Sequence, residues 1–286
     1  MNLLPSLTGL TTLNLKATGI SQKAISEWTD KIDAEQFSKS SLKNLNLSYN
    51  TLLGCTLSNI FSLLTLPNIL SVDLDHCLLN IKQVSASVKK FPVHIFKLNY
   101  NSVCLPAMKQ LLSNVPALKH LSLSGFRCFS DVNGGIAAAL SNLLGGGHEC
   151  NLEHLDLSYC NLTSADLDII RPYLYRCPRL SYLSLAHNRE LSSGSVVAFL
   201  SELQKNFSGS LTSLHLHGIA GLDENDEFEG TLAQVVRRKY HMQKPLQSLS
   251  YRSFLHSNLV LETWKSLFQS EPKVNQIGKD MFFNVM

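Results

Sequence analysis

Residues 42–52, LKNLNLSYNTL, contain the pattern on which the fold depends. In a short strand Leu45 and Leu47 point to one side, while the polar residues between and beside them point to the other. Asn50 stands where the chain must turn, and its side chain can bond backbone groups that would otherwise be buried without partners. The stretch therefore predicts a strand that ends in a turn above a hydrophobic core.

The same pattern recurs along nearly the whole chain of 286 residues. Nine copies, the last one degraded, begin at Leu10, Leu42, Ile69, Val93, Leu118, Leu152, Leu180, Leu211 and Leu246. Segments between them, such as residues 164–177, 193–207 and 227–241, have apolar residues at helical spacing. This period predicts an α/β leucine-rich-repeat solenoid (horseshoe), with parallel strands on the concave face and helices on the convex face. We expect the repeat array to cover residues 1–256 and a C-terminal cap to cover residues 257–286.

The turn position predicts a ladder of side chains that bond the backbone of adjacent turns. It is occupied by an amide or a thiol in five copies, namely Asn50, Cys77, Asn101, Cys160 and Asn188. Thr18, Phe126 and Ile219 replace it in three others, so we expect the ladder to be interrupted there.

Composition excludes several classes of function. Hydrophobic residues make up 44% and charged residues 16%, and the net charge of +3 is too small to suggest binding to nucleic acid or to a membrane surface. The first residues lack the pattern of a signal peptide, and seven cysteines without a CxxC pair predict reduced thiols. We expect no cofactor, no metal and no small-molecule ligand.

The outward strand positions offer a candidate protein-binding surface. Six of the ten histidines and four of the eight tyrosines fall on it. Tyr100, Tyr159, Tyr182 and His187 are the expected anchors, joined by His76, His120, His154 and an acidic rim of Asp73, Asp75 and Asp156. The alternative is that these side chains only fill the width between strands and bond their neighbours.

Enzymatic and metal-binding interpretations have less support. His215 and His217 project to the same side of a strand, but the face has no cysteine to complete a four-ligand zinc site. Asp156 with His154 or His187 has no nucleophile beside it. The first 120 residues contain no arginine, which excludes GTPase activation through an arginine on an early loop. The acidic run at residues 223–230 opens a helix, where it complements the helix dipole.

The last hundred residues carry a narrower resemblance. Residues 181–205, SYLSLAHNRELSSGSVVAFLSELQK, then WKSLFQSEP at 264–272 and GKDMFFNVM at 278–286, resemble the C-terminal end of Tonsoku-like proteins. The resemblance implies a non-enzymatic nuclear scaffold for repair of replication-associated DNA damage, in which this part would hold a large partner subunit. The family's histone-binding ankyrin repeats are absent from this sequence, so no histone-binding residue is carried over.

The N-terminal residues predict a longer protein. MNLLPSLTGL parallels KQLLSNVPAL at residues 109–118, which places Met1 within the closing helix of a preceding repeat, and no polar cap is visible.

The alternative to a repair scaffold is a cytosolic ribonuclease-inhibitor-like or innate-sensor repeat domain that binds proteins.

Overall fold

The computed structural model describes residues 9–30, 40–86, 89–129, 135–145, 150–175, 177–206, 210–222, 225–241 and 246–251. The chain divides into two compact units, residues 1–155 and 156–286. The predicted cap at residues 257–286 lies outside the described residues, so the cap and the array boundary at residue 256 stay predictions. Among the described residues, no helix is long and apolar enough to cross a membrane.

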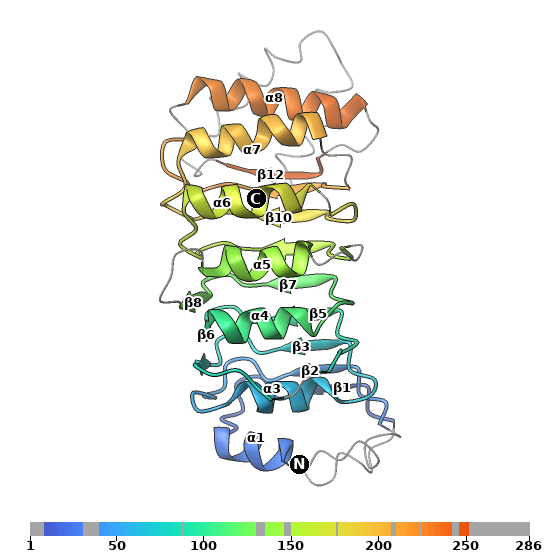
Figure 1. The fold of residues 1–286 in the computed structure, drawn as a ribbon. Helices are drawn as coiled ribbons and strands as arrows, with labels where there is room; N and C mark the ends of the chain where they lie inside the picture. Colours follow the sequence, from blue (N-terminus) through green and yellow to red (C-terminus); the bar gives the residue numbers. More distant parts are fainter. Residues whose placement is uncertain are drawn as a thin grey trace. The chain divides into compact units, whose positions relative to one another are not determined.

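The first unit contains a parallel sheet with helices on one side of it (Figure 1). Its strands pair in the order β1 (Thr12–Asn14), β2 (Asn44–Asn46), β3 (Ser71–Asp73), β5 (Ile95–Lys97) and β7 (His120–Ser122). The amide of His154, the first residue of β9 (His154–Asp156), donates to Lys119 O beside β7 (3.0 Å). The helices are α1 (Gln22–Thr29), α3 (Leu57–Leu64), α4 (Leu105–Ser113) and α5 (Gly135–Gly145).

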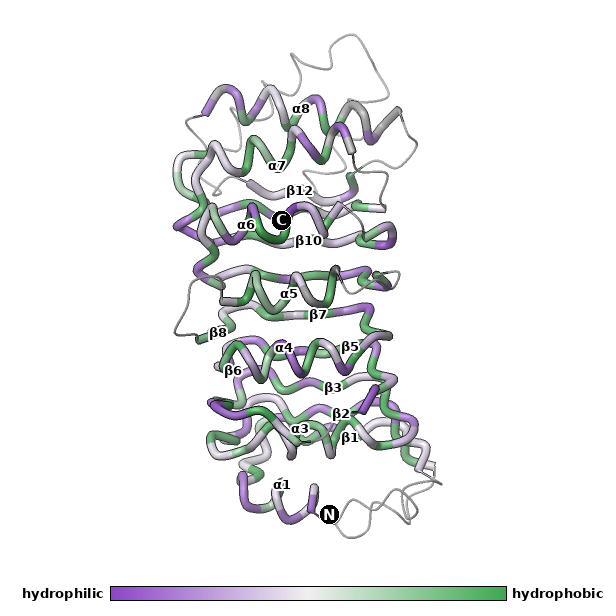
Figure 2. The backbone as a smooth tube through the Cα atoms, in the orientation of Figure 1, coloured by the Kyte–Doolittle hydropathy of each residue, from purple (hydrophilic) through white to green (hydrophobic). Residues whose placement is uncertain are grey.

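The second unit repeats this plan. Its strands β10 (Tyr182–Ser184), β11 (Ser213–His215) and β12 (Ser248–Ser250) are parallel, and its helices are α6 (Ser164–Leu174), α7 (Ser193–Asn206) and α8 (Asp226–His241). The three helices confirm those predicted from the spacing of apolar residues, and hydrophobic and hydrophilic residues alternate along α7 and α8 (Figure 2). Asn225 is the N-cap of α8, since its Oδ1 accepts a hydrogen bond from Phe228 N (3.0 Å). The leucine-rich-repeat fold is thus present in both units.

The strand register confirms the predicted division between core and surface. In the first unit Leu45, Val72, Phe96 and Leu121 are cross-strand neighbours. Each is no more than 1% exposed. Burying such a side chain contributes roughly 1.5–3 kcal/mol, so the column of inward residues fixes the register of every strand. A slip of one residue would turn this column toward solvent.

A second, smaller sheet follows the turns of the third to fifth repeats. It pairs β4 (Asn80–Ile81), β6 (Ser102–Cys104) and β8 (Arg127–Phe129) in parallel. The third repeat departs from the prediction of a helix after every strand, because residues 80–86 and 89–94 form no helix. This repeat is the shortest, and its segment QVSASV is rich in serine and valine, which disfavour helix.

The predicted ladder of turn side chains is present in both units. Asn101, 2% exposed, donates from Nδ2 to the carbonyls of Leu74 (2.7 Å) and Leu98 (3.1 Å), and its Oδ1 accepts from Leu79 N (2.9 Å). Asn50 and Asn188 make the same kind of bonds. Cys77 donates its thiol to Leu47 O (3.2 Å).

The ladder is interrupted where the sequence predicts it. Phe126 and Ile219 are buried and have no polar side-chain atom, while Thr18 Oγ1 donates only to Leu15 O of its own turn (2.8 Å).

Replacing Asn101 by alanine tests the ladder. Because two carbonyls and one amide would lose their partner in a buried site, we expect Asn101→Ala to lower the free energy of unfolding by about 3 kcal/mol. Asn44→Ala is the matched control, since Asn44 is exposed and should change stability by less than about 0.5 kcal/mol. Urea denaturation measures both, and an equal effect of the two substitutions would contradict the role of the ladder.

Candidate functional site

The outward residues of the strands and of the turns that end them form the candidate site, here called the strand face. The register places its columns as predicted: Thr12, Asn44, Ser71, Ile95 and His120 are successive neighbours, and so are Asn14, Asn46, Asp73, Lys97 and Ser122. In the second unit the corresponding neighbours are Tyr182 with Ser213 and Ser184 with His215.

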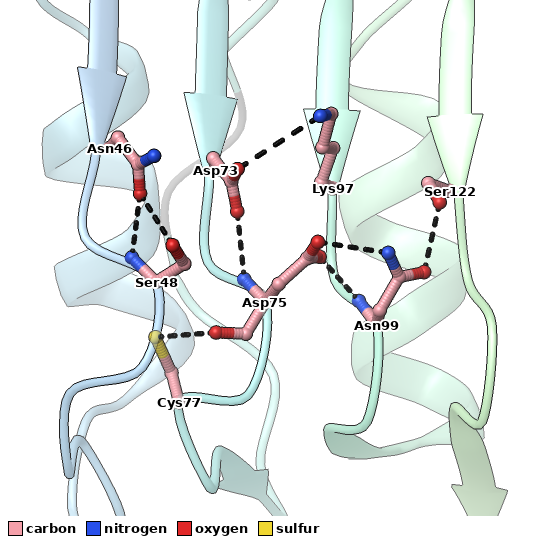
Figure 3. A network of polar contacts seen from close by, with 8 residues as sticks. All are labelled: Asn46, Ser48, Asp73, Asp75, Cys77, Lys97, Asn99 and Ser122. Atoms are coloured by element: carbon pink, nitrogen blue, oxygen red, sulfur yellow. Dashed lines mark hydrogen bonds and ion pairs between the residues drawn. The ribbon is translucent and has the colours of Figure 1, made fainter. Parts of the chain in front are cut away.

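Several side chains of the column that begins at Asn14 bond their own chain two residues further on, namely those of Asn14, Asn46 and Asp73, and of Asp156 at the corresponding position in the second unit. Asn46 Oδ1 accepts from the amide (2.9 Å) and hydroxyl (2.6 Å) of Ser48, and Asp73 Oδ1 accepts from Asp75 N (3.0 Å) (Figure 3). Asp156 does the same with both groups of Ser158. These side chains cap the ends of the strands.

Asp75 and Asn99 join neighbouring repeats of the first unit. The two carboxylate oxygens of Asp75 accept from the amide (2.8 Å) and from Nδ2 (2.9 Å) of Asn99. Asn99 Oδ1 in turn accepts from Ser122 Oγ (2.9 Å), and Lys97 Nζ lies 4.0 Å from Asp73 Oδ2 (Figure 3). Burial raises the pKa of Asp75, although the Asn99 amide opposes the shift. The predicted acidic rim is therefore engaged in bonds within the face.

Aromatic side chains follow one column at the end of the strands, here called the ring column. It consists of Tyr49, His76 and Tyr100 in the first unit and Tyr159 and His187 in the second. All five have left-handed backbone, with φ between 54° and 60°. Each immediately precedes the turn residue of its repeat, so the turn itself directs these side chains outward.

The rings of this column stack on one another within each unit. Ring centroids are 4.5 Å apart for Tyr49 and His76, 4.3 Å for His76 and Tyr100, and 4.2 Å for Tyr159 and His187. Lys16 Nζ lies 4.8 Å from the centroid of Tyr49. Tyr49, Tyr100 and Tyr159 are nevertheless 52%, 45% and 48% exposed. The column is therefore both ordered and accessible.

The last ring of each stack packs against a glycine of the next repeat. Gly125 and Gly218 occupy the equivalent position of their repeats, with φ of 63° and 71°. A Cβ atom at Gly125 would lie 2.6 Å from the ring of Tyr100, and one at Gly218 would collide with His187. Glycine at these positions thus leaves room for the neighbouring ring to lean over the turn.

Other predicted residues form separate pairs on the face. His120 and His154 stack with centroids 5.3 Å apart, and His120 Nε2 lies 3.9 Å from Glu153 Oε2. In the second unit the ring centroids of Tyr182 and His215 are 5.0 Å apart, and burial raises the pKa of Tyr182. Tyr182 is less accessible than the tyrosines of the ring column, because it is half-buried.

His215 and His217 of the second unit, which were not among the predicted binding residues, form a cluster with the predicted His187. His215 Nδ1 and His217 Nδ1 each lie 2.8 Å from Ser250 Oγ, and His217 contacts His187 with centroids 4.6 Å apart. Burial lowers the pKa of His187, His215 and His217, and the neighbouring histidines lower that of His217 further. No group of three or more potential metal ligands occurs among the described residues. None of the seven cysteines, all of which lie among the described residues, forms a disulfide.

The structure thus brings together only part of the predicted set. His76 and Tyr100 are adjacent, as are Tyr159 and His187, while Asp73, Asp75 and Asp156 are bonded within the strand face. The contacts made by Lys16, Asn99 and Ser250 were not predicted: Lys16 lies over Tyr49, Asn99 bonds Asp75, and Ser250 bonds His215 and His217. Their place in the repeat register was the available signal, since each occupies an outward column.

Comparison with known proteins shows similarity to repeat-containing proteins. No family model matches the chain. It is 29% identical to mouse Tonsoku-like protein over 220 residues, 73% of this chain and 16% of that protein. It is 33% identical to the bovine protein of that name over 145 residues, 48% of this chain and 10% of the relative. The chain is similar to Tonsoku-like protein. The predicted resemblance to Tonsoku-like proteins is thereby confirmed.

Two further similarities complete the comparison. Mouse capping protein, Arp2/3 and myosin-I linker protein 3 is 32% identical over 196 residues, 63% of this chain and 14% of that protein. A crystal structure titled as a TLR13–ssRNA13 complex matches 91% of this chain and 35% of its own, with 20% identity and a TM-score of 0.47. The chain therefore spans less than a fifth of the length of each of these three curated relatives.

The histidine cluster predicts a loss of stability on mild acidification. A lowered pKa in the folded state means that the unfolded chain binds more protons between the folded value and the ordinary value near 6.5. The free energy of unfolding should therefore fall as the pH drops below about 6.5. His217→Asn keeps a partner for Ser250 and removes one titrating group, so its urea denaturation midpoint should fall less between pH 7.5 and 5.5. Equal falls for the two proteins would show that His217 does not contribute.

Proposed function

We propose that the chain is a protein-binding scaffold whose partner docks on the strand face, with the ring column as its main contact. The observation that carries this proposal is the combination of order and exposure in Tyr49, Tyr100 and Tyr159. Tyrosine offers a large amphipathic surface at low entropic cost, and rings already held by stacking lose little further freedom on binding. Such residues are typical anchors of protein interfaces.

The polar groups of the face support a division of roles. Asp73, Asp75 and Asp156 already accept hydrogen bonds from their own chain, and a partner that displaced those bonds would gain little net free energy. We therefore propose as the principal contacts Tyr100, Tyr159 and His187 of the ring column, together with the less accessible Tyr182 of the strand face. His76, His120 and His154 would extend the surface, and the carboxylates would set its charge.

The similarity to Tonsoku-like protein supports a more specific role. We propose that the chain is the C-terminal interaction arm of a nuclear complex for repair of replication-associated DNA damage, where it holds a large subunit of that complex. The matched region makes up 16% of the mouse protein, so the proposed role is that of one arm of a larger protein. We propose no catalysis, since Asp156, the carboxylate of the pair considered with His154 or His187, already accepts a hydrogen bond from Ser158 N through Oδ1.

A cytoplasmic linker is the second candidate. It is favoured by the 32% identity to the mouse linker protein, which matches a smaller part of this chain than mouse Tonsoku-like protein does. Capture by the immobilised chain from separate nuclear and cytoplasmic extracts, followed by quantitative mass spectrometry, distinguishes the two. A repair-complex subunit enriched from the nuclear extract supports the first candidate. Actin-associated proteins enriched from the cytoplasmic extract support the second.

A variant with four alanine substitutions tests the docking surface. Loss of one true anchor costs about 2 kcal/mol or more, so combined replacement of Tyr100, Tyr159, Tyr182 and His187 by alanine should weaken binding of the captured partner at least thirtyfold. Isothermal titration calorimetry with the purified partner measures the affinity. Since each lost ring contact costs about 1 kcal/mol of folding stability, circular dichroism must show that the variant remains folded.

The control is Tyr173→Ala, which removes a tyrosine from α6 and leaves the strand face intact. It should bind the partner with unchanged affinity. Full binding by a folded quadruple variant would place the interface on another surface, whichever compartment supplied the partner.

A further inference from the structure

A groove in the first unit lies beside the open edge of the small sheet. One wall is formed by residues 53–58, which include the start of α3, and the other by residues 80–84, which include β4. The groove encloses about 300 Å³, and neither wall contributes a residue to the strand face. It is therefore a separate surface from the one proposed above.

On the side away from β6, the backbone groups of β4 have no hydrogen-bond partner among the described residues. Ser102 N donates to Leu79 O (2.9 Å), and the register pairs Ile81 with Val103, so Ile81 makes the next ladder bonds to β6. In a parallel ladder alternate residues bond to opposite sides. The amide and carbonyl of Asn80 and the amide of Lys82 therefore point away from β6. An edge of this kind is a template for another strand.

Two exposed aliphatic side chains line the groove. Leu53 is 57% exposed and Val84 is 56% exposed, and they stand on opposite walls. Exposed aliphatic side chains on both sides of an open strand edge can receive alternate side chains of an added strand, as in known strand-addition complexes.

The segment that contains one wall of the groove, residues 80–84, carries charge of one sign. Residues 76–130 contain no aspartate or glutamate but six lysines and one arginine. Lys82 lines the groove and makes no ion pair among the described residues. Lys90 Nζ donates to Ser113 O at the end of α4 (2.7 Å), and Arg127 lies in β8 of the same small sheet. The nearest preceding carboxylates in the sequence, Asp73 and Asp75, are on the strand face.

We propose that the groove binds an extended, acidic segment of a partner protein as a fourth strand beside β4. Its backbone would bond Asn80 and Lys82, an apolar side chain would lie between Leu53 and Val84, and its carboxylates would face Lys82 and the neighbouring bases. Binding here does not depend on the ring column, so this site extends the scaffold role to a second kind of ligand.

The test uses the full 286-residue chain and a designed peptide. A fluorescein-labelled peptide of sequence VEVEVEV is titrated by fluorescence anisotropy beside VKVKVKV and a VEVEVEV peptide with alternate amides N-methylated. The acidic peptide should bind at least tenfold more tightly than the other two, because only it offers both carboxylates and free amides. Hydrogen exchange should slow at Asn80 and Lys82 on binding.

Two substitutions locate the peptide, and a third serves as control. Lys82→Glu reverses the charge at the groove, and Leu53→Asp removes an apolar wall; both positions are exposed, so folding should persist. Each substitution should weaken binding of the acidic peptide at least tenfold. Lys43→Glu makes the same charge change at an exposed position outside the groove and should alter affinity by less than twofold.

Several results would overturn the proposal. They are equal binding of the three peptides, no binding of the acidic peptide at 1 mM, equal effects of Lys82→Glu and Lys43→Glu, or exchange protection elsewhere in the chain. Concentration-dependent self-association that Leu53→Asp abolishes would instead assign the groove to a second copy of this chain. None of these results bears on the ring column, whose variant is tested with a different ligand.

Discussion

The structure depends on how each repeat satisfies the backbone groups of its turn. A strand that ends over a hydrophobic core leaves carbonyls and amides where water cannot reach them, and leaving one unpaired costs as much as a lost core contact. Asn50, Asn101 and Asn188 solve this by bonding the turns of two successive repeats at once. Stacking of repeats within each unit is therefore a condition for a stable turn as well as for a buried core.

The same turn produces the ring column. The residue before the turn side chain adopts left-handed backbone in every repeat whose turn is described, from Ala17 to Gly218. Left-handed backbone is uncommon for residues other than glycine, and the ladder bonds that follow it hold the chain in that conformation. Where the position is tyrosine or histidine, its ring is carried beyond the strand end and stacks on the next repeat. The order of the binding surface thus follows from the constraint on the turn.

The first unit has two surfaces of different chemistry. On the strand face, carboxylates and amides pair with each other and leave aromatic rings as the accessible groups. Beside the small sheet, bases have no acidic neighbours in the sequence, and an open strand edge lies among them. The third repeat contains this edge, because β4 is the first strand of the small sheet, and no helix follows it in residues 82–86 and 89–94. A single repeat that departs from the pattern thereby changes the chemistry of the surface.

The sequence by itself determined the repeat, the parallel strands, three helices of the second unit and the outward columns. These follow from spacing, because a period of two within strands and of about 29 residues along the chain leaves one way to bury the leucines. It also determined which residues lie on the strand face. It did not determine how they interact there, since that depends on distances between side chains of different repeats.

Only the tertiary structure decided which of those residues remain accessible. Asp75 was predicted as part of a rim, yet both of its oxygens bond Asn99, and Tyr182 is half-buried against His215. The stacking of Tyr100 over Gly125 and the shared bonds of His215 and His217 to Ser250 join residues 25 to 35 positions apart. Pattern within one repeat cannot report such contacts, because they arise from the packing of one repeat on the next.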